Sequence, residues 1–559
     1  MITILSPVNF LRGILNILDQ KERVRLFVLI FFDVVISALD VIFLGLTLIV
    51  INFYIKNTGL PYTSWLPYSL TNQNSVLLIS VFFILFGIKN LFAYLVSSSR
   101  FRFIYKVASR LSERNIRQYL KDDYIQFVTI DSSVHIRRIS QQPIEFSHYI
   151  LTNFQLIISQ SLLVLFTICA ILFYHASLFL LLFLLLMPAV ILLGWLLKRQ
   201  LKQVRKNIKK ASEETLKHLH EALSGYIESN IYDKDDFFAE RYYSSQQQLN
   251  QNICTQQTLQ AMPSRLIEVF AIFGFFILIV ISKWAVHSPS VDLFTIGVFL
   301  AAAYKIIPGL VAILNSAGQM KTYEFTLNDL LITESKPNPP VKPVDTIHSI
   351  SVNNINFKYK DYPLLNGVGF DLLPGDFAGI SAGSGRGKTT LINILLGLIE
   401  QEDGAVSINN KINTAEERQH YWSRISYIKQ QPFFIHDSML KNITLLESGH
   451  DATKLNEVIS FCGLDTLLAQ YPEGTDWIIS ENGKNLSGGQ RQRMMLARAL
   501  YHGFDLLILD EPFGEIDQLA ENAILTQLQL LAQQGKMIIF ITHNKPSLSF
   551  CNKIISWDE

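Results

Sequence analysis

The stretch AGSGRGKTT, residues 382–390, has the residue types and spacing of a loop that binds nucleotide phosphates. Its glycines let backbone N–H groups turn toward a β-phosphate, Lys388 reaches the β- and γ-phosphates, and Thr389 offers a hydroxyl to Mg²⁺. Ala382 stands where the motif usually has its first glycine, so its methyl group is tolerated there or slightly lowers nucleotide affinity. The predicted nucleotide contacts in this loop are Ala382, Gly383, Ser384, Gly385, Arg386, Gly387, Lys388, Thr389 and Thr390.

Two adjacent carboxylates follow an apolar run in LLILDEP, residues 506–512. We expect Asp510 to hold Mg²⁺ through water and Glu511 to orient and deprotonate the attacking water, because phosphoryl transfer depends mainly on such positioning. His543 follows the strand-like MIIFIT and is predicted to contact the γ-phosphate, although a lone histidine is more often a core residue. Lys388, Glu511 and His543 are therefore the candidate catalytic residues.

The motif LSGGQ, residues 486–490, lies between the phosphate loop and LLILDEP. In this order, the motifs resemble the nucleotide-binding domain of ABC transporters. The resemblance implies that LSGGQ caps the ATP bound on a partner subunit, with Ser487 and Gly489 reaching its γ-phosphate. The nucleotide contacts implied for this motif are Ser487, Gly488, Gly489 and Gln490.

The same resemblance implies roles for three further residues. Tyr359 would stack on adenine, Gln430 would touch Mg²⁺ and report to the membrane domain, and Asp517 would close the site. The expected metal contacts are Thr389, Gln430 and Asp510, and the cofactors are ATP and Mg²⁺. Because every catalytic position is occupied, we expect a homodimer with two competent sites and a nearly inactive monomer.

Apolar residues gather in the first 320 positions of this 559-residue chain, which is 49% hydrophobic and 17% charged overall. Soluble proteins average about 25% charged residues, and blocks of about 20 apolar residues have the length needed to span a bilayer. Two basic runs beside these blocks, residues 102–121 and 198–210, indicate cytoplasmic segments and are better explained as solvated faces than as a nucleic-acid site. Six spans are predicted, near residues 26–53, 75–98, 151–174, 177–197, 265–286 and 293–316.

The predicted fold is multi-domain. An all-α transmembrane domain of six helices (1–330) and a linker rich in proline (331–347) precede an α/β P-loop nucleotide-binding domain (348–559). Buried strands are expected at Phe377–Ser381, Ile425–Ile428, Leu506–Leu509 and Met537–Ile541. An amphipathic helix over residues 10–18 suits the cytoplasmic face of the membrane. The chain is expected in the cell inner (plasma) membrane as a multi-pass protein with its nucleotide-binding domain in the cytoplasm.

Fused membrane and ATPase halves resemble the exporter type of ABC protein. The stretches AAAYKIIPG (301–309) and MPSRLIE (262–268) are similar to those of lipid-linked-oligosaccharide flippases. The resemblance implies ATP-driven flipping of an amphipathic substrate, most simply a lipid-linked saccharide, by alternating access. The alternative is an exporter of a peptide, siderophore or drug-like solute. An ATP-gated channel is disfavoured because Glu511 and His543 are intact. Two breaks in the helical pattern, 121–127 and 225–238, would be the elements that contact the ATPase domains.

Five ionisable residues fall inside the predicted spans: Asp33, Asp40, Lys89, Glu268 and Lys305. Charges at membrane depth are costly, so they pair with each other, lie near the interface or face a cavity. Ion pairs are the simpler interpretation. The alternative is that Lys89 and Lys305 line a path and attract an anionic headgroup.

Overall fold

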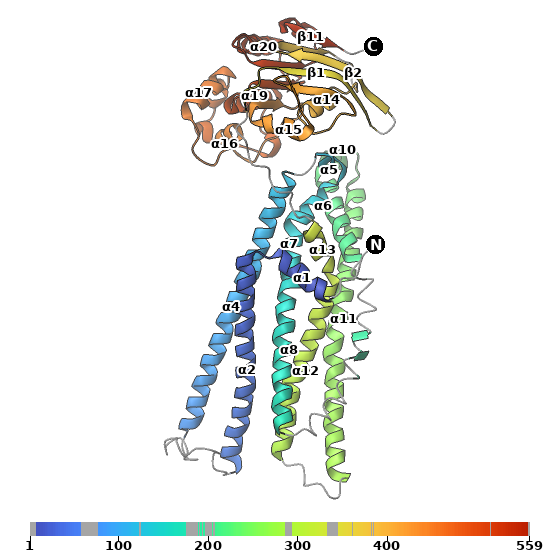
Figure 1. Cartoon of the computed structure of the whole chain (residues 1–559), viewed down its shortest axis with the longest axis vertical. Helices are drawn as coiled ribbons and strands as arrows, with labels where there is room; N and C mark the ends of the chain where they lie inside the picture. The colour runs from blue at the N-terminus through green and yellow to red at the C-terminus, as the bar shows by residue number, and fades with distance from the viewer. Residues whose placement is uncertain are drawn as a thin grey trace. The chain divides into compact units, whose positions relative to one another are not determined.

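The computed structural model describes residues 7–56, 76–121, 124–174, 188, 191–192, 194–195, 204, 207–284, 293–332, 345–359, 362–381, 383, 385–514 and 516–556. The chain divides into two compact units (Figure 1). The first comprises Met1–Asp122 and Val128–Lys336, and the second comprises Asp123–Phe127 and Pro337–Glu559. Most of the predicted linker lies outside the described residues.

The first unit is helical in its described part (Figure 1). Its long helices are α2 (Gln20–Lys56), α4 (Leu77–Tyr119), α8 (Thr152–Tyr174), α11 (Asp235–Trp284) and α12 (Leu293–Thr322). Each covers all or most of one of the predicted spans, whereas the span predicted near 177–197 falls almost entirely outside the described residues. Within the part that was searched, three stretches are long and apolar enough to cross a membrane: Gln20–Ile51, Leu77–Tyr119 and Ser132–Phe173.

Shorter helices connect or extend these five. These short helices are α1 (Pro7–Ile17), α5 (Tyr124–Thr129), α6 (Ser132–Ile136), α7 (Gln142–Glu145), α10 (Tyr226–Ile231) and α13 (Glu324–Ile332). Two wider π-type turns, Arg137–Gln141 and Phe146–Leu151, interrupt the helical run that leads into α8. Residues 207–224 are also helical.

The amphipathic helix α1 buries its apolar face in protein. Ile14 and Ile17 join a core cluster with Leu327 of α13, and Gly13 is so close to Leu327 that an added Cβ would lie 3.2 Å from it. Arg110 of α4 closes the end of α1 by donating to the carbonyl of Ile17 over 2.9 Å. The face predicted to rest on the membrane is therefore largely occupied by the chain itself.

The basic residues of α4 are only partly solvated. Arg110 also makes two hydrogen bonds of 2.7 Å to the carboxylate of Glu22 in α2. Arg114 donates to the carbonyl of Leu330 in α13 over 3.3 Å. These arginines therefore tie helices together, while Arg102, Lys106 and Arg117 remain exposed as the sequence indicates.

Ion pairs join α2 to α4 at membrane depth. Lys89 pairs with Asp40, and Arg100 pairs with Asp33 over 3.5 Å. Because Lys89 and Asp33 are buried, each charge is offset where it would otherwise be costly. The ion-pair interpretation therefore holds for Lys89, and the suggestion that it lines a substrate path is not supported.

The second unit is built on two larger sheets. A parallel sheet has the strand order β11 (Lys553–Ser556), β3 (Phe377–Ser381), β10 (Met537–Ile541), β9 (Leu506–Asp510) and β6 (Ile425–Ile428). An antiparallel sheet has the order β2 (Tyr362–Leu372), β1 (Ile350–Tyr359), β4 (Asp403–Ile408) and β5 (Lys411–Ile412). A two-stranded ribbon pairs β7 (Asp437–Ser438) with β8 (Ile478–Ile479). The four predicted strands are all neighbours in the parallel sheet.

Helices cover both faces of the parallel sheet, which explains why its strands are apolar throughout. The α-helices of this unit are α14 (Lys388–Leu395), α15 (Ala415–Gln419), α16 (Met439–Thr444), α17 (Ala452–Phe461), α18 (Asp465–Leu468), α19 (Gly488–His502) and α20 (Gln518–Gln533). Alternate residues of β9 enter different cores: Leu506 and Ile508 face α14, and Leu507 and Leu509 face α19 and α20. A helical membrane unit followed by an α/β unit confirms the predicted fold class.

Candidate active site

The phosphate loop joins β3 to α14. Gly385 and Gly387 have φ angles of +76° and +83°, which L-residues rarely adopt, so glycine is required by the turn. An added Cβ at Gly387 would also lie 2.8 Å from the Leu365 side chain. The loop delivers Lys388 to the first turn of α14, where backbone N–H groups and the helix dipole favour a bound anion.

Lys388, His543 and Glu511 converge at the carboxyl ends of the central strands. Lys388 Nζ lies 2.7 Å from His543 Nε2 and 3.5 Å from Glu511 Oε1. His543 Nε2 lies 3.0 Å from the same carboxylate oxygen. The three predicted catalytic side chains are thus brought together from the ends of three elements, α14, β9 and β10.

Gln430, which follows β6, reaches the same carboxylate. Its Nε2 donates a hydrogen bond of 2.8 Å to Glu511 Oε2. Glu511 itself has a φ of +49°, a left-handed conformation that costs free energy for a residue with a side chain. Its backbone N–H donates to the carbonyl of Ile541 over 3.0 Å, which holds this conformation in place.

Asp510 is buried at the end of β9 and accepts two hydrogen bonds on one oxygen. Thr389 Oγ1 and Tyr427 OH lie 3.4 Å and 3.3 Å from Asp510 Oδ2. Burial and the neighbouring charge of Glu511 raise the pKa of Asp510, whereas the two hydrogen bonds lower it. A carboxylate beside a threonine hydroxyl fits Mg²⁺, which prefers oxygen ligands and takes few from the protein. Gln430 bonds Glu511 here, so its contact with a metal remains a prediction.

An open cavity of about 680 Å³ lies at this site, and neither Asp510 nor Tyr427 is among the residues that line it. Of the predicted residues, its lining includes Gly385, Gly387, Lys388, Thr389, Thr390, Gln430, Glu511 and His543, together with Leu364. Ala382 and Ser384 lie outside the described residues, as does the side chain of Tyr359. Gly383 and Arg386 belong to the loop, joined by a backbone hydrogen bond of 3.4 Å.

The signature residues Ser487, Gly488, Gly489 and Gln490 form the first turn of α19 and do not line this cavity. Ser487 Oγ accepts from the N–H of Gln490, and the Gln490 side chain accepts from the N–H of Ser487. This reciprocal cap fixes the helix start with its glycines at the surface. Asp517 likewise caps α20 by accepting from Ala520 N over 2.9 Å.

Tyr427 is a site residue that the sequence analysis missed. The signal was available in the strand alternation, because residues two apart face the same side of a sheet. Tyr427 is in register with Ile508 in β9, so it shares a face with Asp510 two residues further on. Predicting the contact also requires that β6 and β9 are neighbours, which the sequence does not state.

Family models match both units. The model described as ABC transporter transmembrane region matches residues 26–304, and the one described as ABC transporter matches residues 365–514. This chain belongs to the ABC transporter family, as a fused membrane and ATP-binding half-transporter. It is a multi-pass membrane protein of the inner (plasma) membrane with a cytoplasmic nucleotide-binding domain, as predicted.

Similar proteins include a probable ABC transporter ATP-binding/permease protein of Haemophilus influenzae, 30% identical over 37% of this chain and 38% of its own length. The chain thus matches about two fifths of that relative. An ATP-dependent lipid A-core flippase of Photobacterium profundum is 24% identical over 65% of this chain and 63% of its own length. The solved structure of a bacterial Atm1-family ABC exporter with ATP bound has a TM-score of 0.79 at 15% identity, covering 97% of this chain and 94% of that one. This last likeness concerns the fold.

Proposed function

We propose that two copies of this chain form an ATP-driven flippase that moves a lipid-linked saccharide across the membrane by alternating access. Lys388 binds the β- and γ-phosphates of ATP, His543 contacts the γ-phosphate, and Glu511 orients and deprotonates the attacking water. Mg²⁺ held at Asp510 and Thr389 would neutralise charge on the phosphates. Hydrolysis separates the nucleotide-binding domains because ATP binds the closed dimer better than the open one.

The position of the signature residues supports a dimer. Ser487 and Gly489 are presented at the start of α19, away from the cavity that holds Lys388 of the same chain. A second copy would bring its signature residues to that cavity and complete the site. An exposed apolar group on and beside α10 also suits a subunit contact, because such groups rarely remain in water. Its members are Leu223, Tyr226, Ile227, Ile231 and Tyr232, each at least 64% exposed.

The main support for the proposed class of substrate is the position of Lys305. It lies half-buried in the apolar middle of α12, and among the described residues it has no ion-pair partner, in contrast to Lys89. An ionisable residue at membrane depth without a partner is a candidate ligand site. Its chemistry fits an anionic group such as the phosphate that joins a saccharide to a lipid.

A cluster of amides at the cytoplasmic end of the bundle is consistent with a sugar-bearing headgroup. Asn153 of α8 donates to Gln319 of α12 over 2.8 Å, and Gln319 donates to Gln260 of α11 over 3.0 Å. Gln260 is 6% exposed, and its Nε2 has no acceptor among the described residues. Amides offer both donors and acceptors without charge, as saccharide hydroxyls require. The relatives named lipid A-core flippases support the same class.

The test uses the full-length protein in lipid vesicles with a fluorescent lipid-linked oligosaccharide. We expect ATP-dependent movement of the label between leaflets, stimulation of ATP hydrolysis by the glycolipid, and loss of both in Glu511→Gln. Lys305→Ala should lower transport more than basal hydrolysis, whereas Lys210→Ala, at an exposed position of the helical run 207–224, should leave both unchanged. ATP hydrolysis that does not respond to the glycolipid would contradict the flippase proposal and favour a peptide, siderophore or drug-like solute as the substrate.

A further inference from the structure

Tyr427 places a phenol against the carboxylate that is expected to hold the metal ion. Its OH lies 3.3 Å from Asp510 Oδ2, the oxygen that also accepts from Thr389 at 3.4 Å. The ring is half-buried and packs on the core that contains Leu506 and Ile508. Its position is therefore set by the sheet and does not depend on a mobile loop.

The phenol acts only as a donor here. A phenol normally loses its proton only at about pH 10, so the Tyr427 OH has a proton to donate to Asp510 Oδ2 at physiological pH. Two donors on one oxygen restrict rotation of the carboxylate and so set the direction in which its other oxygen, Oδ1, points. Both distances exceed the usual O–H···O length of about 2.7–2.8 Å. Each is therefore a weaker contact than a typical hydrogen bond, and the two act together on the same oxygen.

We propose that Tyr427 is a positioning residue that orients Asp510 toward the Mg²⁺ of the ATPase reaction. Tyr427 does not line the cavity that contains Lys388, and it is distinct from the candidate catalytic residues. The inference rests on the proposed metal role of Asp510. Hydrogen-bond partners of the groups that hold a metal ion change metal affinity by about tenfold or more, and an effect of the same size is expected here, where Asp510 holds Mg²⁺ through water.

The variant Tyr427→Phe removes only the hydroxyl. Tyr501→Phe is the matched control, because Tyr501 is a buried tyrosine of the same unit whose OH accepts from Asp451 N over 2.9 Å. The full-length protein is loaded with a non-hydrolysable ATP analogue, and Mn²⁺ affinity is measured by the electron paramagnetic resonance of the free ion. Nucleotide affinity in EDTA and thermal stability are measured in parallel.

We expect Tyr427→Phe to weaken Mn²⁺ binding about tenfold and to leave nucleotide affinity in EDTA unchanged. Tyr501→Phe should match the wild type in both affinities, whatever its thermal stability. Unchanged Mn²⁺ affinity in Tyr427→Phe overturns the inference. So does an equal loss of nucleotide affinity in EDTA, which indicates a general structural role. The variant Asp510→Asn tests the metal role of Asp510 separately from the positioning role of Tyr427. Wild-type Mn²⁺ affinity in Asp510→Asn would show that Asp510 does not hold the metal ion.

Discussion

Gln430 donates a hydrogen bond of 2.8 Å from its Nε2 to Oε2 of Glu511. This bond links the segment after β6 directly to the candidate general base. The other carboxylate oxygen, Oε1, faces Lys388 and His543. Glu511 is thus contacted on both oxygens, so a change in the position of Gln430 alters the orientation of the base. Movement of the segment after β6 can therefore reach the candidate general base directly, without a residue in between.

Glu511→Gln should retain nucleotide binding and lose hydrolysis by a factor on the order of 10²–10⁴, because a positioned general base contributes about that much. An amide keeps the shape of the side chain and can still accept from Gln430. The checks are steady-state phosphate release and retention of radiolabelled ATP. Hydrolysis near the wild-type rate would remove the assignment of Glu511 as the base.

Substitution of the two loop glycines should separate backbone strain from steric conflict. Gly385→Ala meets no atom within 4 Å and should cost about 1 kcal/mol for its left-handed conformation. Gly387→Ala adds contacts with Leu364 and Leu365 and should cost roughly 1–3 kcal/mol more. Thermal unfolding of both variants, with and without ATP, measures the difference. Equal stability losses would contradict the loop geometry.

The pair Lys89–Asp40 should behave as a structural unit. Lys89→Met leaves Asp40 unpaired within the α2–α4 contact and should lower stability by about 3 kcal/mol, and Lys89→Met with Asp40→Asn should recover most of that loss. A double-mutant cycle by thermal unfolding in nanodiscs gives the coupling. The double variant should still transport substrate. Loss of transport in this variant would instead indicate that Lys89 lines the substrate path.

Arg110→Ala should loosen the end of α1 at Ile17, while the buried apolar face of the helix stays in place. The substitution removes the bonds to Glu22 and the cap on Ile17, which together hold the end of α1 beside α2 and α4. Limited proteolysis near residue 19 should become faster, while the exposed variant Arg117→Ala serves as the control. Arg110→Lys should restore the Glu22 pair only in part, since lysine cannot bind a carboxylate in two places.

Local pattern was sufficient for the phosphate loop and for four strands of the parallel sheet, but not for β11 at its edge. The runs Phe377–Ser381 and Met537–Ile541 are continuous and apolar because helices bury both faces, and the structure has strands with these same bounds. The sequence analysis did not anticipate the antiparallel sheet, since β1 and β2 are irregularly paired and carry many polar residues. The ion-pair partners of Lys89 and Arg110 could not be predicted from local pattern. Nothing near these two residues in the sequence indicates that Asp40 and Glu22 lie opposite them.

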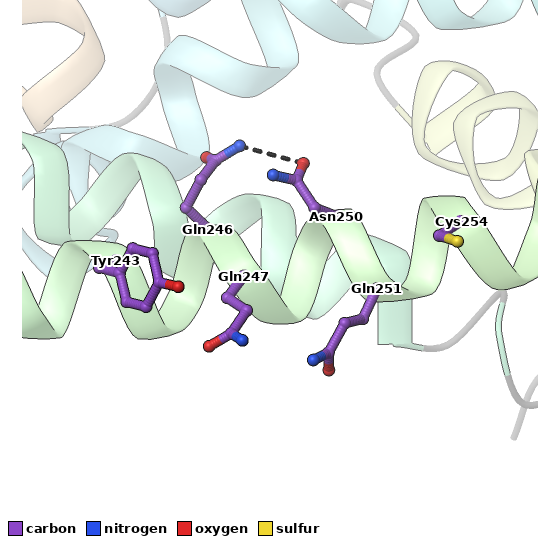
Figure 2. A pocket seen from close by; sticks show the side chains of 6 residues that line it. All are labelled: Tyr243, Gln246, Gln247, Asn250, Gln251 and Cys254. Carbon is purple, nitrogen blue, oxygen red and sulfur yellow. Dashed lines mark hydrogen bonds between the residues drawn. The ribbon is translucent and has the colours of Figure 1, made fainter.

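The cytoplasmic half of α11 carries amides in place of charges. No ionisable acid or base other than tyrosine and cysteine occurs between Arg241 and Arg265, a stretch that includes Gln246, Gln247, Asn250 and Gln251. Figure 2 shows these side chains along the helix beside Tyr243 and Cys254, where they line a hollow of about 350 Å³ and Gln246 bonds Asn250 over 3.2 Å. Dissolved salt screens charges over about 8 Å at physiological ionic strength, but it has little effect on bonds between neutral groups. Contacts made by the amides of this stretch should therefore depend little on ionic strength.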